Sequence, residues 1–135
     1  MNSVFVDTSY WLALELGNDQ NHQIAITHWQ GILPALPPLV TTSYVLDEVV
    51  TFFNSRGYHA KAVQVGSSLL HSASVPFIHV DEALFYEGWT YFQRHADKRY
   101  SLTDCVSFTV MQKLGIGVAF TFDKHLVQAG FRVEP

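Results

Sequence analysis

Short apolar segments with the composition of strands alternate with segments of helical periodicity along the whole of this 135-residue chain. Such alternation favours an α/β fold, because each strand is followed by a helix that covers the sheet. We therefore predict a three-layer α/β/α sandwich with a mostly parallel central sheet. The predicted strands are residues 3–6, 39–41, 75–80, 118–122 and 131–133. The predicted helices are residues 10–16, 22–33, 43–56, 58–72, 82–95 and 101–114.

Two of these segments carry further signals. Pro76 places the strand at residues 75–80 at a sheet edge or at its own start, because proline cannot donate a ladder hydrogen bond. Asp81 is placed to cap the helix that follows it. The apolar residues of that helix recur at helical spacing, and we expect them to form a stripe facing the core: Leu84, Phe85, Trp89 and Phe92.

The bulk composition is that of one globular domain. The sequence is 48% apolar and 15% charged, and a chain of this length buries roughly two-thirds of the surface that it exposes when unfolded. We therefore expect residues 1–135 to form a single domain. The lone Cys105 cannot form a disulfide within the chain and indicates a reducing compartment.

The beginning of the sequence is apolar, but it does not have the pattern of a secretion signal. It lacks a basic leading segment, and Asp7 lies inside the apolar stretch. No uninterrupted apolar run approaches the ~18 residues needed to span a bilayer. These features predict a cytoplasmic protein with no membrane partner.

Four acidic residues are placed where an α/β fold collects ligands. Asp7 and Asp123 each follow a short apolar strand, and in open parallel sheets ligands bind at the carboxyl ends of strands. Glu48 lies about one turn into a helix that follows a strand. Asp104 lies in the first turn of another helix, where Ser101 and Asp104 are spaced as a capping box. All four carboxylates are therefore expected to face one crevice.

Carboxylates that converge without lysine or arginine partners need a cation, because like charges at short range disfavour ionisation. Oxygen ligands without a His or Cys pair at metal-binding spacing favour Mg²⁺ or Mn²⁺ over zinc. These ions leave positions open for phosphate oxygens, so the predicted chemistry is hydrolysis of a phosphodiester bond. The net charge of −4 argues against a nucleic-acid partner, but acids gathered around divalent cations make that objection weaker.

The order of the acids and the residues around them resemble the PIN-domain family. The motifs are Phe-Val-Asp-Thr-Ser at residues 5–9, Thr-Ser-Tyr-Val-Leu-Asp-Glu at 42–48, Ser-Leu-Thr-Asp-Cys at 101–105 and Thr-Phe-Asp at 121–123. The segment Ser-Leu-Thr-Asp-Cys-Val-Ser-Phe is similar to one VapC-like branch of ribonuclease toxins. The resemblance extends over the whole chain, and its strength lies in the four motifs occurring together in order.

The resemblance implies a metal-dependent endoribonuclease, the toxin of a VapBC-type toxin–antitoxin pair. It implies that the catalytic metal ligands are Asp7, Glu48, Asp104 and Asp123, and that the hydroxyl groups supporting these ligands belong to Thr8, Ser9 and Thr121. The implied partners are an RNA substrate, a cognate antitoxin protein and a second copy of the chain, as a homodimer.

Two points stay open at the level of sequence. Adjacent helical residues point about 100° apart, so only one of Asp47 and Glu48 can enter the site; the family pattern favours Glu48. A cationic rim that guides the RNA backbone is predicted at Lys98, Arg99 and Lys124, against the alternative that these residues are a solvated loop. His125 is predicted as a substrate contact.

Other functions fit the sequence less well. A catalytically silent PIN-like scaffold that binds RNA or protein would have little reason to retain all four acids. A nuclease for structured DNA would need elements to clamp a duplex, and this chain is short. A phosphatase with a covalent aspartate is poorly supported, because no second Asp lies two positions after Asp7. Cys105 has no evident His or Asn partner for nucleophilic catalysis, and a core position is predicted for it.

Overall fold

The computed structural model describes residues 2–73 and 75–135 and contains a five-stranded sheet in which every pairing is parallel. The strand order is β3-β2-β1-β4-β5. The strands are β1 (Val4–Val6), β2 (Leu39–Thr42), β3 (Phe77–Ile78), β4 (Val118–Phe120) and β5 (Arg132–Glu134). The predicted α/β fold with a parallel central sheet is therefore confirmed.

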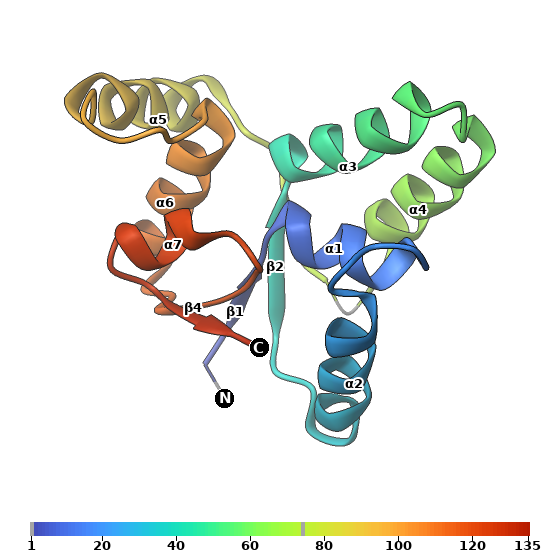
Figure 1. Cartoon of the computed structure of the whole chain (residues 1–135). Coiled ribbons are helices and arrows are strands. Elements are labelled where there is room, and N and C mark those ends of the chain that lie inside the picture. Colours follow the sequence, from blue (N-terminus) through green and yellow to red (C-terminus); the bar gives the residue numbers. More distant parts are fainter. Residues whose placement is uncertain (1, 74) are drawn as a thin grey trace.

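Helices cover both faces of the sheet. Figure 1 shows α1 to α4 on one side of the strands and α5 to α7 on the other. The helices are α1 (Thr8–Glu15), α2 (His22–Ile32), α3 (Ser43–Ser55), α4 (His59–His71), α5 (Glu82–Arg94), α6 (Leu102–Leu114) and α7 (Lys124–Gln128), with a short 3-10 helix at Leu33–Ala35. Within the part of the chain that the structure describes, none of these helices has the length and apolar character needed to cross a membrane.

The strand order places β1 at the centre of the sheet. From β1 the chain builds outward through β2 to β3, and it then returns past β1 to form β4 and β5. The strands at this reversal are buried, as the apolar residues at 4–6 and Phe120 show. Because β1 was followed by strands on one side and β4 lies on the other, the order of strands reverses between β1 and β4. In α/β folds, ligands bind in the crevice at the carboxyl ends of the strands at such a reversal.

The predicted strand at residues 118–122 is too long, and a helix after it is missing from the prediction. Strand β4 ends at Phe120, and the chain turns through Thr121 and Phe122 into the short helix α7. Asp123 is the N-cap of α7, and its Oδ1 accepts a hydrogen bond of 2.9 Å from the backbone N–H of His125. The five residues of α7 are too few to show the hydrophobic periodicity that predicts a helix from sequence.

The prediction of a four-residue core stripe on α5 is wrong in part. Leu84 is buried, but Trp89 and Phe92 are 41% and 39% exposed and stack on one another at a centroid distance of 5.6 Å. The cause is the close packing of α5 on α6, in which a Cβ atom at Gly88 would lie 2.6 Å from a methyl group of Val106. This contact buries a stripe centred on Leu84 and Gly88 and leaves the two aromatic rings outside it.

The predicted edge position of strand 75–80 agrees with the sheet, although the strand itself is shorter. Strand β3 contains only Phe77 and Ile78. Among the described strands it pairs with β2 alone, at the edge of the sheet. Pro76 contributes its carbonyl oxygen, which accepts from the backbone N–H of Thr41 at 3.4 Å. The missing donor of Pro76 therefore does not interrupt the sheet.

Candidate active site

Asp7 lies directly after β1, at the reversal of strand order. Its backbone N–H donates to the carbonyl of Phe120 at 3.0 Å, so the ends of β1 and β4 are joined at this residue. The side chain is only 4% exposed. It accepts a hydrogen bond of 2.9 Å from the hydroxyl of Thr121 to Oδ2. Asp7 therefore forms the floor of the crevice.

Two hydroxyl groups fix the loop that follows β4. Thr121 Oγ1 accepts from the backbone N–H of Asp123 at 2.9 Å and lies 3.0 Å from Ser9 Oγ. Ser9 Oγ in turn accepts from the backbone N–H of Phe122 at 2.9 Å. Thr121 and Ser9 therefore connect the start of α1 to the loop that carries Asp123, and they hold Asp7 and Asp123 on the same side of the sheet.

Asp104 reaches the crevice from the first turn of α6. The predicted capping box is present, with the backbone N–H of Asp104 bonded to Ser101 Oγ and the backbone N–H of Ser101 bonded to Asp104 Oδ2, both at 3.0 Å. The same Oδ2 atom lies 3.0 Å from Nδ1 of His125. The capping box fixes the orientation of this carboxylate, and His125 contacts the oxygen that the capping box already uses.

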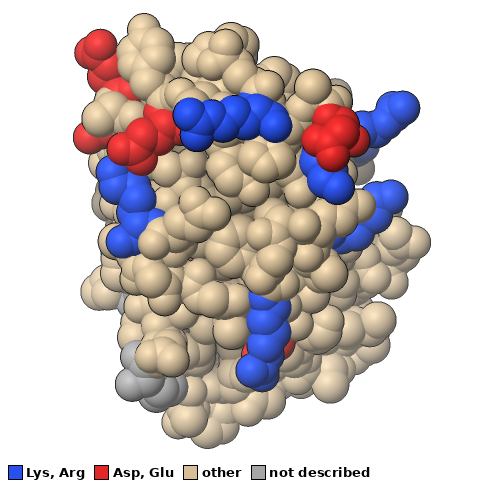
Figure 2. Space-filling view, turned by 90° about the vertical axis from the view of Figure 1, so that its left-hand side faces the viewer, with Lys and Arg blue, Asp and Glu red and all other residues tan. Residues whose placement is uncertain are grey.

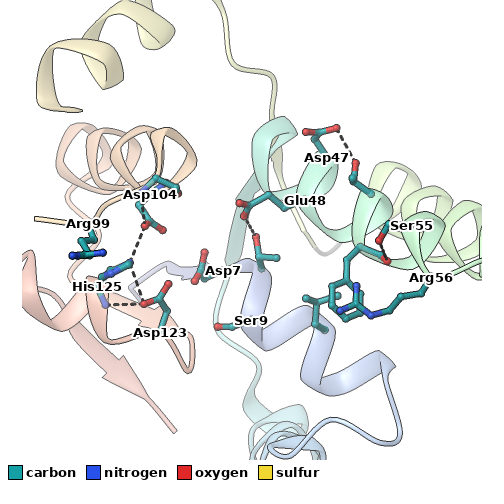
Figure 3. Close-up of a pocket in the computed structure, with 15 residues that line it drawn as sticks. Asp7, Ser9, Asp47, Glu48, Ser55, Arg56, Arg99, Asp104, Asp123 and His125 are labelled. Atoms are coloured by element: carbon teal, nitrogen blue, oxygen red, sulfur yellow. Dashed lines mark hydrogen bonds and ion pairs between the residues drawn. The ribbon is translucent and has the colours of Figure 1, made fainter. Parts of the chain in front are cut away.

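Glu48 reaches the crevice from α3, whose N-cap is Thr42. Glu48 Oε1 accepts a hydrogen bond of 2.6 Å from the hydroxyl of Thr8. Asp47 is exposed and lies 3.4 Å from the hydroxyl of Thr51. In Figure 3 the Glu48 carboxylate lies on the side of Asp7, whereas Asp47 points away from it. This geometry favours Glu48 over Asp47 as the residue that faces the site.

One pocket of about 620 Å³ collects these side chains. Its acidic part contains Asp7, Glu48, Asp104 and Asp123, together with His125 (Figure 3). Thr8 and Ser9 also line it, and the exposed Asp47 lies at its edge. Residues that are more than a hundred positions apart in the sequence therefore meet in a single concave site, as the strand-end argument predicts.

Burial makes the ionised form of these acids unfavourable. It raises the pKa of Asp7 from 3.8 to about 7, against the opposing effect of the Thr121 hydrogen bond. Burial also raises the pKa of Glu48 and of Asp104, and repulsion from neighbouring carboxylates adds to both shifts. A positive charge in the pocket would reverse these effects, because it favours the charged form.

A cation fits the donors that the pocket offers. One ligand atom each from Asp104, Asp123 and His125 lies within 4.8 Å of the other two. Carboxylate oxygens are the ligands that Mg²⁺ and Mn²⁺ prefer, and an imidazole nitrogen is compatible with a transition metal. The sequence indicated His125 only as a substrate contact, since a histidine two positions after Asp123 has no recognisable metal spacing. Its position beside Asp104, 21 residues away, depends on the tertiary fold.

The basic residues near the pocket differ from the predicted rim. Arg99 lines the pocket, but Lys98 and Lys124 are not among its lining residues. Lys98 lies 3.7 Å from its neighbour Asp97. Figure 2 shows that lysine and arginine side chains on the face formed by α5 to α7 are dispersed, and that several of them lie beside acidic side chains. A second arginine, Arg56 at the end of α3, lines the pocket and was missed from the sequence.

Cys105 is a core residue, as predicted. Its side chain is fully buried beside Asp104, and burial raises the pKa of the thiol to about 11. A thiol with this pKa stays protonated at neutral pH, and the thiolate is the nucleophilic form. Cys105 is therefore not a nucleophile in this pocket.

A parallel α/β sheet with acids gathered where the strand order reverses defines the class to which this protein belongs. The chain is a member of the PIN-domain family, whose model matches residues 4–132. It is 40% identical over 129 residues to the 23S rRNA-specific endonuclease VapC20 of two Mycobacterium tuberculosis strains, and the match covers 95% of each chain. The predicted resemblance to the PIN family and its VapC branch is confirmed.

Solved structures agree with this assignment. The crystal structure of Mycobacterium tuberculosis VapC20, described as a sarcin-ricin loop cleaving toxin, superimposes with a TM-score of 0.86 at 36% identity and covers 95% of both chains. FitAcB from Neisseria gonorrhoeae superimposes with a TM-score of 0.64 at 13% identity, over 98% of this chain and 96% of that one. The second match supports the fold alone.

Proposed function

We propose that this protein is a divalent-metal-dependent endoribonuclease and the toxin of a VapBC-type module, with 23S rRNA as its substrate. The observation that carries the proposal is the convergence of four carboxylates in one pocket, three of them with a pKa raised by burial. The substrate comes from the relative, whose name specifies 23S rRNA and whose structure is described as cleaving the sarcin-ricin loop.

In this proposal Asp7, Glu48, Asp104 and Asp123 hold Mg²⁺ or Mn²⁺. A bound divalent ion supplies charge that stabilises the scissile phosphate and promotes ionisation of the attacking water. The protein contributes fixed geometry: Thr8, Ser9 and Thr121 hold the carboxylates or the loop that carries them through the hydrogen bonds described above. Hydrogen bonds to ligating carboxylates of this kind tune metal affinity.

His125 orients the acidic part of the pocket. Its backbone N–H and its ring contact Asp123 Oδ1 at 2.9 and 3.3 Å, and the ring lies 3.0 Å from Asp104 Oδ2. We propose that this ring joins the acids in holding the metal. Arg99, with Lys98 and Lys124 on the nearby surface, guides the RNA backbone toward the acids.

The proposed partners are a cognate antitoxin and a second copy of this chain. Exposed aromatic side chains on α5 support a homodimer, because monomers rarely leave large apolar groups together in solvent. These side chains are Tyr86, Trp89 and Phe92. We place the protein in the cytoplasm, where ribosomal RNA is accessible and Cys105 stays reduced.

A cleavage assay with matched variants tests the proposal. Purified protein is incubated with ribosomes in Mn²⁺ or in EDTA, and the 23S rRNA ends are mapped by primer extension. We expect one cut in Mn²⁺, none in EDTA and none with Glu48→Gln. Asp47→Asn removes the neighbouring exposed charge and should leave the cut intact. Cleavage by Glu48→Gln at the wild-type rate, or wild-type cleavage in EDTA, would reject the proposal.

A further inference from the structure

The pocket is larger than a metal site requires. An ion with six waters occupies roughly 200 Å³ at ~30 Å³ per water, whereas the pocket measures about 620 Å³. The additional volume is lined by one face of α3 and by α1. Its lining residues are Leu12, Thr51, Phe52, Ser55 and Arg56. One acid borders this second part, the exposed Asp47, whose carboxylate lies 3.4 Å from the Thr51 hydroxyl.

The α3 face connects the two parts of the pocket. Glu48, Phe52 and Arg56 follow one another at intervals of four residues, so they lie along one side of the helix. Eight residues correspond to ~12 Å along a helix axis. Arg56 is therefore placed beside the acidic part and not within it. Figure 3 shows Arg56 on the opposite side of the pocket from Asp123 and Arg99.

Arg56 is held in place by an aromatic ring. Its guanidinium carbon lies 3.7 Å from the centroid of the Phe52 ring. A guanidinium stacked in this way keeps its N–H edges free to donate, and its planar fork matches a phosphate. The stacking also reduces the number of side-chain conformations that Arg56 loses when it binds a ligand.

Arg56 is one of the basic side chains that no carboxylate neutralises in the part of the chain that the structure describes. The chain has eight lysine and arginine residues. Four form ion pairs, namely Lys61, Lys98, Lys113 and Arg132. Among the described residues the other four have no carboxylate within ion-pair distance, and of these Arg56 and Arg99 line the pocket. Both are therefore available to an anion that enters the pocket.

We propose that Arg56, stacked on Phe52, is a substrate-positioning residue that binds a backbone phosphate of the RNA strand outside the scissile linkage. This inference rests on the proposed ribonuclease function. An RNA strand would then cross the acidic part of the pocket with one phosphate at the acids and another phosphate of the same strand at Arg56. Arg56 also lies at the C-terminal end of α3, where a cation stabilises the helix dipole, so the test must separate substrate binding from helix stability.

The test measures RNA binding without cleavage. Asp7→Asn serves as the background, and the probe is an RNA hairpin with the sarcin–ricin loop sequence. In that background we expect Arg56→Ala to weaken binding about tenfold, the effect of losing one charge-assisted contact. The slope of log affinity against log salt should become shallower by about 0.7. Arg56→Lys should recover part of the loss, since it keeps the charge but not the stacked fork.

The matched control is Arg94→Ala, which removes an unpaired arginine from the end of α5 outside this pocket. It should leave binding unchanged. In the wild-type background, Arg56→Ala should raise KM about tenfold and leave kcat within a few-fold, while its thermal melting curve stays close to that of wild type.

Three outcomes are informative. Weaker binding by Arg56→Ala with a shallower salt slope supports the inference. Unchanged binding by Arg56→Ala, in a protein whose wild-type form cleaves RNA, overturns the inference and leaves the proposed function intact. Failure of the wild-type protein to cleave any RNA overturns the proposed function and this inference with it.

Discussion

Asp7→Asn is expected to stabilise the protein when no metal is bound. The Asp7 carboxyl is 4% exposed, and its pKa rises from 3.8 to about 7 on folding. Between these two values the unfolded chain has released the proton and the native protein still holds it. The free energy of unfolding therefore falls as the pH rises through this interval, because the native state binds more protons.

The size of the effect follows from the two pKa values. Each pKa unit corresponds to 1.36 kcal/mol, so the full interval amounts to ~4 kcal/mol, an upper limit if the native state relaxes. Asparagine does not ionise, and its side-chain oxygen can still accept from Thr121. Above about pH 7 and without metal, Asp7→Asn should exceed wild type in stability by up to ~4 kcal/mol. Near about pH 4 the two proteins should be nearly equal.

Urea unfolding in EDTA at about pH 5 and about pH 8 measures this difference. Saturating Mn²⁺ should offset most of it, because a ligand at 100 times its Kd stabilises the native state by ~2.7 kcal/mol and only wild type retains the full ligand set. Asp47→Asn is the control, as an exposed acid beside the site. Identical pH dependence in wild type and Asp7→Asn would refute the reasoning.

Three further predictions concern other parts of the structure. Thr121→Val should lower metal affinity about 10- to 100-fold in a Mn²⁺ titration, because it removes the hydroxyl that contacts Asp7 and Asp123. Intact affinity would show that the hydroxyl plays no part in holding the ligands. Gly88→Ala should destabilise the protein by about 1–3 kcal/mol in urea, since its Cβ would lie 2.6 Å from a Val106 methyl group; no change would mean that α5 shifts freely. Replacing Trp89 and Phe92 together by serine should convert a homodimer to a monomer in sedimentation experiments, with little loss of monomer stability; a dimer that persists would place the interface elsewhere.

The sequence predicted those features that depend on local pattern and on topology. Strands that end next to an acid, alternating with helices, were sufficient to place Asp7, Glu48, Asp104 and Asp123 at one end of a parallel sheet. The capping box at Ser101 was readable because it involves two residues three positions apart. A capping box can be predicted from sequence because both of its hydrogen bonds form within one helical turn, whatever the rest of the fold.

Other features depend on distances that a sequence does not contain. His125 meets Asp104 only because the loop after β4 folds back over the start of α6. Arg56 enters the pocket because α3 is oriented with Glu48 toward Asp7, which carries Phe52 and Arg56 along the same wall. One signal for Arg56 was present: it lies eight residues after Glu48, on the same helical face.

The exposed rings of α5 illustrate a different limit. Helical periodicity marks an apolar face, but it does not say how wide a stripe the neighbouring helix will cover. Here α5 packs closely on α6 at Gly88, and the part of α5 that α6 covers is a narrow stripe centred on Leu84 and Gly88. Trp89 and Phe92 therefore fit the periodicity of a core and still lie in solvent.

The central claim is that the acids of this pocket share a divalent ion, and a crystal soaked in Mn²⁺ tests it most directly. Anomalous diffraction should show a peak among the carboxylate oxygens of Asp7, Asp104 and Asp123, and the peak should disappear in Asp104→Asn. Absence of any peak there, at a Mn²⁺ concentration that supports RNA cleavage in solution, would contradict the account.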